Sequence, residues 1–162
     1  MTIVNGGPSS SYYDRVPATH LDGTAIFQNE QDRRNEREVA DAIEKAWQCS
    51  IHSFGQLAPI DWYAVRDGRM VGILEMKSRS HIYGTYETTL INIRKWFALT
   101  FAAVGLGVPG IFVVRFTDQI RWIPIAAVDG EKHRLANCRH VLKSKSDVAP
   151  QIEVPIADMR PL

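Results

Sequence analysis

The stretch PIDWYAVRDGRMVGILEMKS, residues 59–78, decides how the rest of the sequence is interpreted. Apolar and polar residues alternate on both sides of Asp67-Gly68, as they do in β-strands with one buried face. An Asp-Gly pair between two such segments indicates a β-hairpin. We therefore predict two antiparallel strands, Ile60–Arg66 and Met70–Ser78, joined by a short turn.

The length of the hairpin loop decides which side chains of the two strands share a face. A two-residue loop would place Asp61 opposite Leu74, on the other face of the sheet from Glu75. A three-residue loop, with Gly68 left-handed in a type I turn and G1 bulge, places Asp61 opposite Ile73. Asp61 and Glu75 then share one face, and the bulged loop is our prediction.

Charged residues end the second strand of this hairpin. Glu75 and Lys77 are two residues apart and so lie on the same face of the strand, after the apolar Val71 and Ile73. An acid-x-Lys triplet occurs by chance about once in a chain of this length, so the triplet alone carries no weight. Its place after Asp61 makes the hairpin end a candidate site.

A third carboxylate comes from a helix that we predict over residues 29–48. Glu36 precedes Val39 by three residues and Ile43 by seven, so it continues the apolar stripe of the helix towards the sheet. Three carboxylates and a lysine suit a hard divalent cation, which takes oxygen ligands and water. Such a cation would stabilise charge on a phosphate and lower the pKa of a bound water.

Two structural alternatives stay open at this point. Asp61, Glu75 and Lys77 could form cross-strand salt bridges at an exposed hairpin end, with no catalytic role. Glu36 could equally be a surface charge near the start of its helix. Clustered carboxylates repel each other unless a cation or a proton intervenes. The metal-site hypothesis therefore predicts that Mg²⁺ or Mn²⁺ raises thermal stability.

The remaining segments predict an α/β fold in which a mixed central sheet is flanked by helices. Residues 1–27 are rich in Gly, Ser, Pro and Thr and form an irregular arm, and residues 28–162 form one domain. The further elements predicted are a strand at Cys49–Phe54, a helix at Thr88–Val104, strands at Ile111–Phe116 and Gln119–Ile125, a basic segment at 131–147 and an edge strand at Ile152–Ile156.

The second predicted helix begins a long uncharged run. No charged residue occurs from Trp96 to Val114, which is long enough to span a bilayer. The glycines and proline of Gly105–Gly110 would break a spanning helix, so we predict a helix tail followed by a buried strand. The stripe formed by Leu90, Ile93, Phe97 and Phe101 is predicted to face the core.

Composition places the chain among ordinary globular proteins. It has 162 residues, 45% of them hydrophobic and 23% charged, with a formal net charge of +1. This balance excludes a nucleic-acid binder that works by global charge, but not one with a local basic face. Two cysteines give no disulfide framework, and the first residues lack the features of a signal peptide. We expect a protein of the reducing cytoplasm, outside membranes.

The arrangement Pro59-Ile60-Asp61, a hairpin, then Glu75-Met76-Lys77, with Glu36 on the helix before it, resembles the PD-(D/E)XK nuclease superfamily. The small single-domain members of phages and the resolvase-like nucleases of branched DNA are the most similar. The resemblance covers about residues 30–125 in the order helix, three strands, helix, two strands. Here Ile60 separates the proline from the aspartate; the proline is not a ligand.

The resemblance implies a restriction-endonuclease-like α/β/α core and metal-dependent hydrolysis of DNA phosphodiester bonds, including those of branched recombination or repair intermediates. Asp61, Glu75 and the Met76 carbonyl would bind Mg²⁺, for which Mn²⁺ substitutes. Glu36 would act on the metal directly or through water, and Lys77 on the nucleophilic water. Nucleases of this type commonly act as homodimers. The alternative is a non-catalytic nucleic-acid-binding or assembly module with the same fold.

Basic residues near these elements could follow a DNA backbone. Most charged positions between buried stripes are solvated surface, and Arg79 and Lys95 are the stronger candidates because they are close in sequence to the site elements. Tyr83, Tyr86 and Trp96 could stack on unpaired bases. The full predicted set comprises Arg79, Arg94, Lys95, Lys132 and Arg134.

Two further motifs carry little weight. Gly105–Gly110 matches G-x-G-x-x-G, but it follows a helix and precedes a strand, the reverse of a dinucleotide-binding unit, so we predict a helix C-cap. Cys49 and His52 with Cys138 and His140 have unusual spacing for zinc, which is a distant alternative. No P-loop sequence occurs, so this chain would not itself drive an ATP-dependent activity.

Overall fold

The computed structural model describes residues 30–55, 58–129, 133–136 and 150–162, and of residues 30–32 only the backbone. The predicted arm, residues 1–27, lies outside these ranges. So do Lys132, most of the basic segment, and the Cys138–His140 half of the zinc alternative. The first described element is helix α1 (Glu30–Trp47), which agrees with the predicted helix.

A six-stranded mixed sheet forms the centre of the fold. Its order is β1-β2-β3-β5-β6-β9. Strands β3 and β5 are parallel, and every other neighbouring pair is antiparallel. The strands are β1 (Ser50–Ser53), β2 (Trp62–Arg66), β3 (Arg69–Ser78), β5 (Gly110–Arg115), β6 (Ile120–Pro124) and β9 (Arg160–Pro161).

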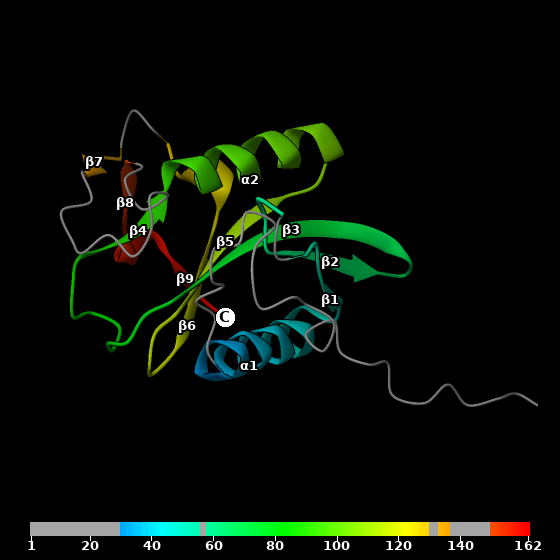
Figure 1. The fold of residues 1–162 in the computed structure, drawn as a ribbon, viewed down its shortest axis with the longest axis horizontal. Coiled ribbons are helices and arrows are strands. Elements are labelled where there is room, and N and C mark those ends of the chain that lie inside the picture. Colours follow the sequence, from blue (N-terminus) through cyan, green and yellow to red (C-terminus); the bar gives the residue numbers. More distant parts are fainter. Residues whose placement is uncertain (1–29, 56–57, 130–132, 137–149) are drawn as a thin grey trace, which may run out of the picture.

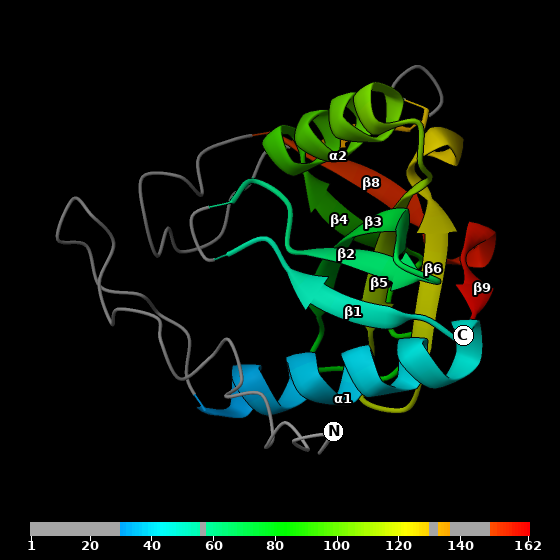
Figure 2. The same ribbon diagram turned by 90° about the vertical axis from the view of Figure 1, so that its right-hand side faces the viewer.

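Helices α1 and α2 (Ile93–Leu106) cover opposite faces of this sheet, so the fold has three layers (Figures 1 and 2). Successive residues of β3 supply the two faces. Leu74 packs in one cluster with Ile43 of α1, and Ile73 packs in the other with Leu99 of α2. The predicted α/β fold with a mixed sheet between helices is confirmed.

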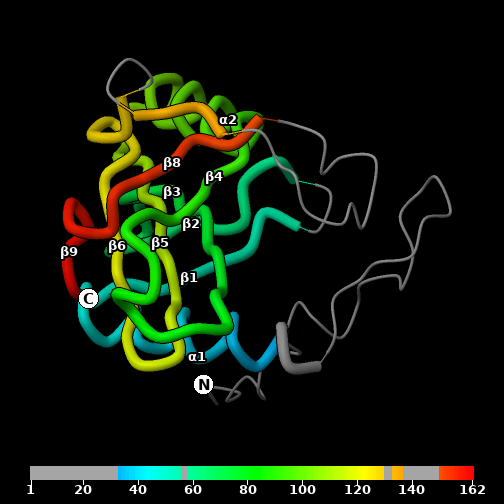
Figure 3. The backbone as a smooth tube through the Cα atoms, turned by 90° about the vertical axis from the view of Figure 1, so that its left-hand side faces the viewer, coloured from blue at the N-terminus to red at the C-terminus, as the bar shows by residue number. Residues whose placement is uncertain are grey.

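A second, three-stranded sheet was not predicted. Strand β8 (Gln151–Pro155) lies between β4 (Thr88–Asn92) and β7 (Leu135–Ala136), and Figure 3 shows β8 running beside β4 near α2. The prediction of an edge strand here was therefore wrong in its position. Pro155 is tolerated because it is the last residue of β8.

The helix predicted from Thr88 begins five residues later than expected. Thr88 to Asn92 form β4, in which buried and half-buried residues alternate. Threonine and isoleucine favour a strand, and β8 supplies the pairing partner for it. The helix starts after Asn92, whose side-chain oxygen accepts a hydrogen bond from the Arg94 backbone N–H.

The outward face of α2 is more apolar than predicted. The stripe containing Phe97 and Phe101 was expected to be buried, but both rings are exposed and stack on each other with centroids 5.8 Å apart. The helix instead turns Leu99 and its small alanines towards the sheet. A Cβ atom at Gly110 of β5 would lie 3.1 Å from the Ala103 Cβ, so this glycine permits the close approach.

The uncharged run divides as predicted into a helix tail and a strand. Gly107 ends α2 with φ 65°, and its N–H donates to the carbonyls of Ala103 and Val104. The glycine motif is thus a C-cap. Within the described ranges, no helix has both the length and the apolar character needed to cross a membrane.

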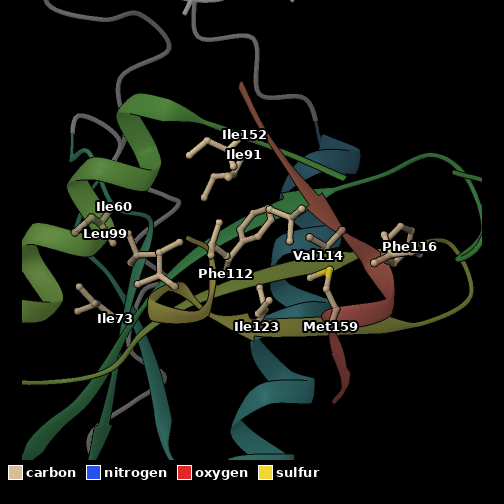
Figure 4. Packing of buried hydrophobic residues seen from close by; sticks show 14 residues of the cluster. Ile60, Ile73, Ile91, Leu99, Phe112, Val114, Phe116, Ile123, Ile152 and Met159 are labelled. Carbon is tan, nitrogen blue, oxygen red and sulfur yellow. The ribbon is translucent and has the colours of Figure 1, made fainter. Parts of the chain in front are cut away.

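The larger core lies between α2, the main sheet and the second sheet. Figure 4 shows Ile91 of β4 beside Ile152 of β8, with Phe112 of β5 nearby. Ile91 and Ile152 are paired residues in the second sheet. This core holds the second sheet against the main sheet, and with it the strand that leads into α2.

Candidate active site

The β2–β3 hairpin closes with a two-residue turn, and the prediction of a three-residue loop was wrong. Arg66 pairs with Arg69, and Asp67 and Gly68 have φ angles of 50° and 72°. Two consecutive left-handed residues match the type I′ turn, whose twist fits a hairpin and which favours Asp-Gly.

A β-bulge inside the hairpin changes the register. Val65 pairs with Met70, but Ala64 pairs with Gly72, so Val71 is an extra residue on β3. Val71 consequently packs with the α1-side cluster, and the prediction that it shares a face with Ile73 was wrong. The bulge shifts the pairing by one residue and so replaces the bulge predicted in the loop.

The corrected register still brings Asp61 beside Glu75. Trp62 pairs with Leu74, and continuing this antiparallel pairing by one residue sets Asp61 across from Glu75. The Nζ atom of Lys95 lies 3.0 Å from Asp61 Oδ1 and 3.0 Å from Glu75 Oε2. The two carboxylates therefore converge on one point, the ammonium of a residue in the first turn of α2.

Asp61 is fixed by backbone contacts as well as by Lys95. Its Oδ2 atom accepts a hydrogen bond of 2.9 Å from the Met76 backbone N–H. Its carbonyl accepts one of 3.2 Å from the Phe54 N–H. The residue thus ties the end of β1 to the end of β3, which limits where its carboxylate can move.

Glu75 is buried, with 7% of its surface exposed. Burial above all, together with the nearby Asp61 carboxylate, raises the pKa of Glu75 from 4.5 to about 8, although Lys95 acts in the opposite direction. Burial penalises the charged form of an acid, and a like charge nearby has the same effect. The free site therefore favours protonated Glu75 near neutral pH.

Replacing Glu75 with glutamine should remove a pH dependence of stability. Between about pH 4.5 and pH 8 the folded state holds a proton on Glu75 that the unfolded chain releases, so metal-free stability falls as pH rises. The decrease from this group amounts to at most about 3.5 kcal/mol between about pH 5 and pH 8.

Urea unfolding in EDTA at those two pH values measures the effect. Wild type should lose more stability than Glu75→Gln on going from the lower to the higher pH. Equal losses in the two proteins would contradict the raised pKa of Glu75.

Lys95 was predicted to contact DNA, and the structure places it between the two carboxylates. Burial alone would lower its pKa, but Glu75 and Asp61 outweigh burial, so the pKa of Lys95 is raised and the side chain stays charged. The sequence signal for this position was its place in the first turn after Asn92, which was obscured because the helix was predicted to start earlier.

Lys77 shares the α2-side face of β3 with Glu75. Burial lowers the pKa of the Lys77 ammonium and Arg79 lowers it further, whereas Glu75 and Asp61 raise it. The residue keeps an exposed surface in the pocket described below. Lys77 is thus an ammonium with a lowered pKa that lies beside the carboxylate pair.

Arg79 was predicted to bind a DNA backbone, yet two of its nitrogens already donate hydrogen bonds to β4. Its Nε donates to Thr89 Oγ1 at 3.1 Å, and a terminal nitrogen donates to the Leu90 carbonyl at 2.9 Å. Burial lowers the pKa of this guanidinium. Arg79 therefore joins the end of β3 to β4, and a contact with DNA stays a prediction.

A pocket of about 390 Å³ opens over these groups. Its walls come from β3, β4, β5, the start of α2 and β8, so both sheets contribute to it. The lining residues are Pro59, Glu75, Lys77, Leu90, Ile91, Asn92, Arg94, Lys95, Phe112 and Gln151. Three of them are cations, which favours an anionic occupant.

Glu36 is not brought to the carboxylate pair. It is half-buried on α1, which covers the sheet face opposite to the one that carries Glu75. No group of three or more His, Cys, Asp or Glu suited to a metal occurs among the described residues. A role for Glu36 on a metal stays a prediction that this arrangement does not favour.

The other predicted contacts are divided between the pocket and the periphery. Arg94 is exposed and lines the pocket, and Arg134 is exposed beside β7. The Met76 carbonyl belongs to a strand edge next to Asp61, and its metal-binding role is a prediction. Lys132 lies outside the described residues.

The donor set fits a magnesium ion. Two carboxylate oxygens already converge on one cation, and Mg²⁺ is usually held by one or two carboxylates with waters and substrate phosphates completing the octahedron. Asp61 and Glu75 are the residues that would hold such an ion.

Comparison with protein families decides the classification. The sequence model of a family described as "Phage putative PDDEXK endonuclease" matches residues 25–162. The chain belongs to this PDDEXK endonuclease family. The match confirms the resemblance noted in the sequence, and it extends from just before α1 to the end of β9. A comparison with curated proteins gives no match.

The fold of this PDDEXK family member is similar to a solved resolvase structure. The Holliday junction resolvase Hjc of Archaeoglobus fulgidus superposes with a TM-score of 0.53 at 14% sequence identity. The similarity covers 79% of this chain and 86% of the resolvase chain. At this identity the similarity establishes the shared fold.

Proposed function

We propose that this PDDEXK family member is a Mg²⁺-dependent deoxyribonuclease that hydrolyses phosphodiester bonds of branched DNA. The observation that carries the proposal is the convergence of Asp61 and Glu75 on one cation position, with Lys77 beside it in the pocket. The likeness to a Holliday junction resolvase supports a branched substrate. The working location would be the cytoplasm, that of the host if the gene belongs to a phage.

Each group has a distinct task in this proposal. The ion held by Asp61 and Glu75 would polarise the phosphate and activate a water, and Mn²⁺ would substitute for Mg²⁺. Asp61, fixed by the Met76 N–H, presents its carboxylate in a constant place. Lys77 contacts the attacking water or the charge that develops on the phosphate. Arg94 at the pocket rim attracts the DNA backbone.

A panel of labelled nucleic acids tests the proposal with purified full-length protein. The panel contains a four-way junction, linear duplex, single strand, supercoiled plasmid and RNA, each with Mg²⁺ and with EDTA. We expect cleavage that needs the metal and is strongest on the junction. Metal-dependent cleavage of another member would change the substrate class, and no cleavage of any would contradict the proposal.

The second candidate is a non-catalytic DNA-binding module. The pairing of Lys95 with both carboxylates favours it, because this contact is also what a purely structural salt-bridge cluster would show. Tight, metal-independent binding to the panel without any cleavage would support the module.

We further propose that the chain forms a homodimer through the outward face of α2. Phe97, Phe101 and Val104, at helical spacing on one face of α2, expose large apolar surfaces, and contiguous apolar patches mark interaction sites. Phe101 has 69% of its surface exposed. A second copy of the same helix would cover these side chains.

Phe101→Glu should convert the dimer into a monomer in sedimentation velocity at micromolar concentration, because it would bury a charge in an apolar interface. Tyr86→Glu, which changes an exposed aromatic residue away from α2, serves as the control and should stay dimeric. A monomeric wild type would contradict the homodimer.

A further inference from the structure

Lys95 occupies the place where the proposed metal would be held. Its ammonium contacts Asp61 Oδ1 and Glu75 Oε2 at the same distance, 3.0 Å. One carboxylate precedes β2 and the other is on β3, and the lysine comes from α2, so three separate segments meet at this point. When both acids are ionised, the contact offsets the repulsion between them.

The ammonium and a divalent cation cannot share this position. A metal bound by the same two oxygens would meet the positive charge of Lys95 at contact distance, where like charges repel in this partly buried site. The lysine side chain has a flexible four-carbon stem and can leave without any movement of α2. Metal binding and the Lys95 ion pairs therefore compete.

We propose that Lys95 is the internal counter-ion of the metal-free site, that it is displaced when the metal binds, and that it thereby weakens metal affinity. This inference rests on the proposed metal-dependent function. When displaced, the ammonium remains at the pocket it already lines with Lys77 and Arg94. The released ammonium would lie near the DNA phosphate. The residue that weakens metal binding in the free site would therefore strengthen DNA binding once the metal is present.

Metal titration of the full chain tests the competition. Mn²⁺ binding is measured by isothermal titration calorimetry at about pH 8.5 for wild type and Lys95→Met. We expect Lys95→Met to bind at least about fivefold more tightly, since two competing, partly buried ion pairs are removed. Arg94→Met removes a positive charge one residue away, without an ion pair to Asp61 or Glu75, and should bind much as wild type does.

The outcomes separate this inference from the proposed function. Equal or weaker binding by Lys95→Met, or the same gain in Arg94→Met, would overturn the counter-ion role while leaving a metal-dependent nuclease intact. Absence of binding in wild type and in Lys95→Met would overturn both.

A second measurement avoids dependence on the stability of Lys95→Met. In ¹⁵N-lysine NMR of wild type, a paired ammonium is protected and visible, and Lys95→Arg assigns the Lys95 signal. Mg²⁺ should shift or remove that signal, whereas the backbone amide signal of Lys45, which is exposed on α1, should not respond. A Lys95 signal unchanged at saturating Mg²⁺ would overturn the displacement.

Discussion

Lys77→Ala is expected to reduce metal-dependent DNA cleavage by about 10³-fold, the range found when a positioned proton-transfer or charge-stabilising group is removed. Lys77 lies beside the carboxylate pair but bridges neither acid, in contrast to Lys95. Mn²⁺ binding by the variant should therefore stay close to the wild-type value. Single-turnover cleavage of the preferred DNA, with metal titration in parallel, measures both quantities.

Lys45→Ala is the matched control for this prediction. Lys45 is an exposed lysine in the last turn of α1, on the other side of the sheet from the pocket. Its replacement should leave cleavage within about twofold of wild type, as expected for a distant surface charge. If Lys77→Ala behaved in the same way, Lys77 would have no part in the reaction.

Leu99→Ala is expected to destabilise the protein by about 2–5 kcal/mol, the usual cost of a cavity left by a buried leucine. Leu99 has none of its surface exposed and packs with Ile73 and Phe112. For a protein of this size the loss corresponds to a decrease in Tm of about 10 °C. Because Leu99 is one turn after Lys95 on α2, the variant should also weaken the placement of that lysine.

Leu135→Ala provides a comparison with the same chemical change at the surface. Leu135 has 57% of its surface exposed in β7, and its replacement should change stability by no more than about 0.5 kcal/mol. Urea unfolding in EDTA measures both variants. Similar losses in the two would mean that α2 is not anchored through Leu99.

Local patterns in the sequence predicted most of the main sheet. Alternation and the Asp67-Gly68 pair located β2 and β3, and the uncharged run was correctly divided between helix and strand. The position of the bulge could not be predicted, because it depends on Val71 packing against α1 rather than on turn chemistry. Asp61 and Glu75 were nevertheless correctly placed on one face.

Long-range pairing explains the errors outside the hairpin. Residues 88–92 have apolar side chains that also fit a helical stripe, and only β8, far along the chain, makes them a strand. The same error moved the expected start of α2. Lys95 was assigned to the DNA backbone from its closeness in sequence to the site elements, whereas it pairs with the two carboxylates. Glu36 lies on the apolar stripe of its helix, but the periodicity of the helix could not predict which face of the sheet α1 covers.

The pairing of Asn92 with Gln151 also affects the order in which the protein folds. The β2–β3 hairpin closes through neighbouring residues, whereas β4 and β8 must meet across about sixty residues of chain, and such distant contacts form slowly. The two acids are therefore expected to come together early during folding. The pocket wall built by β4 and β8 is expected to form last. The folding rate of this small sheet would then set how quickly an unfolded chain recovers a complete pocket.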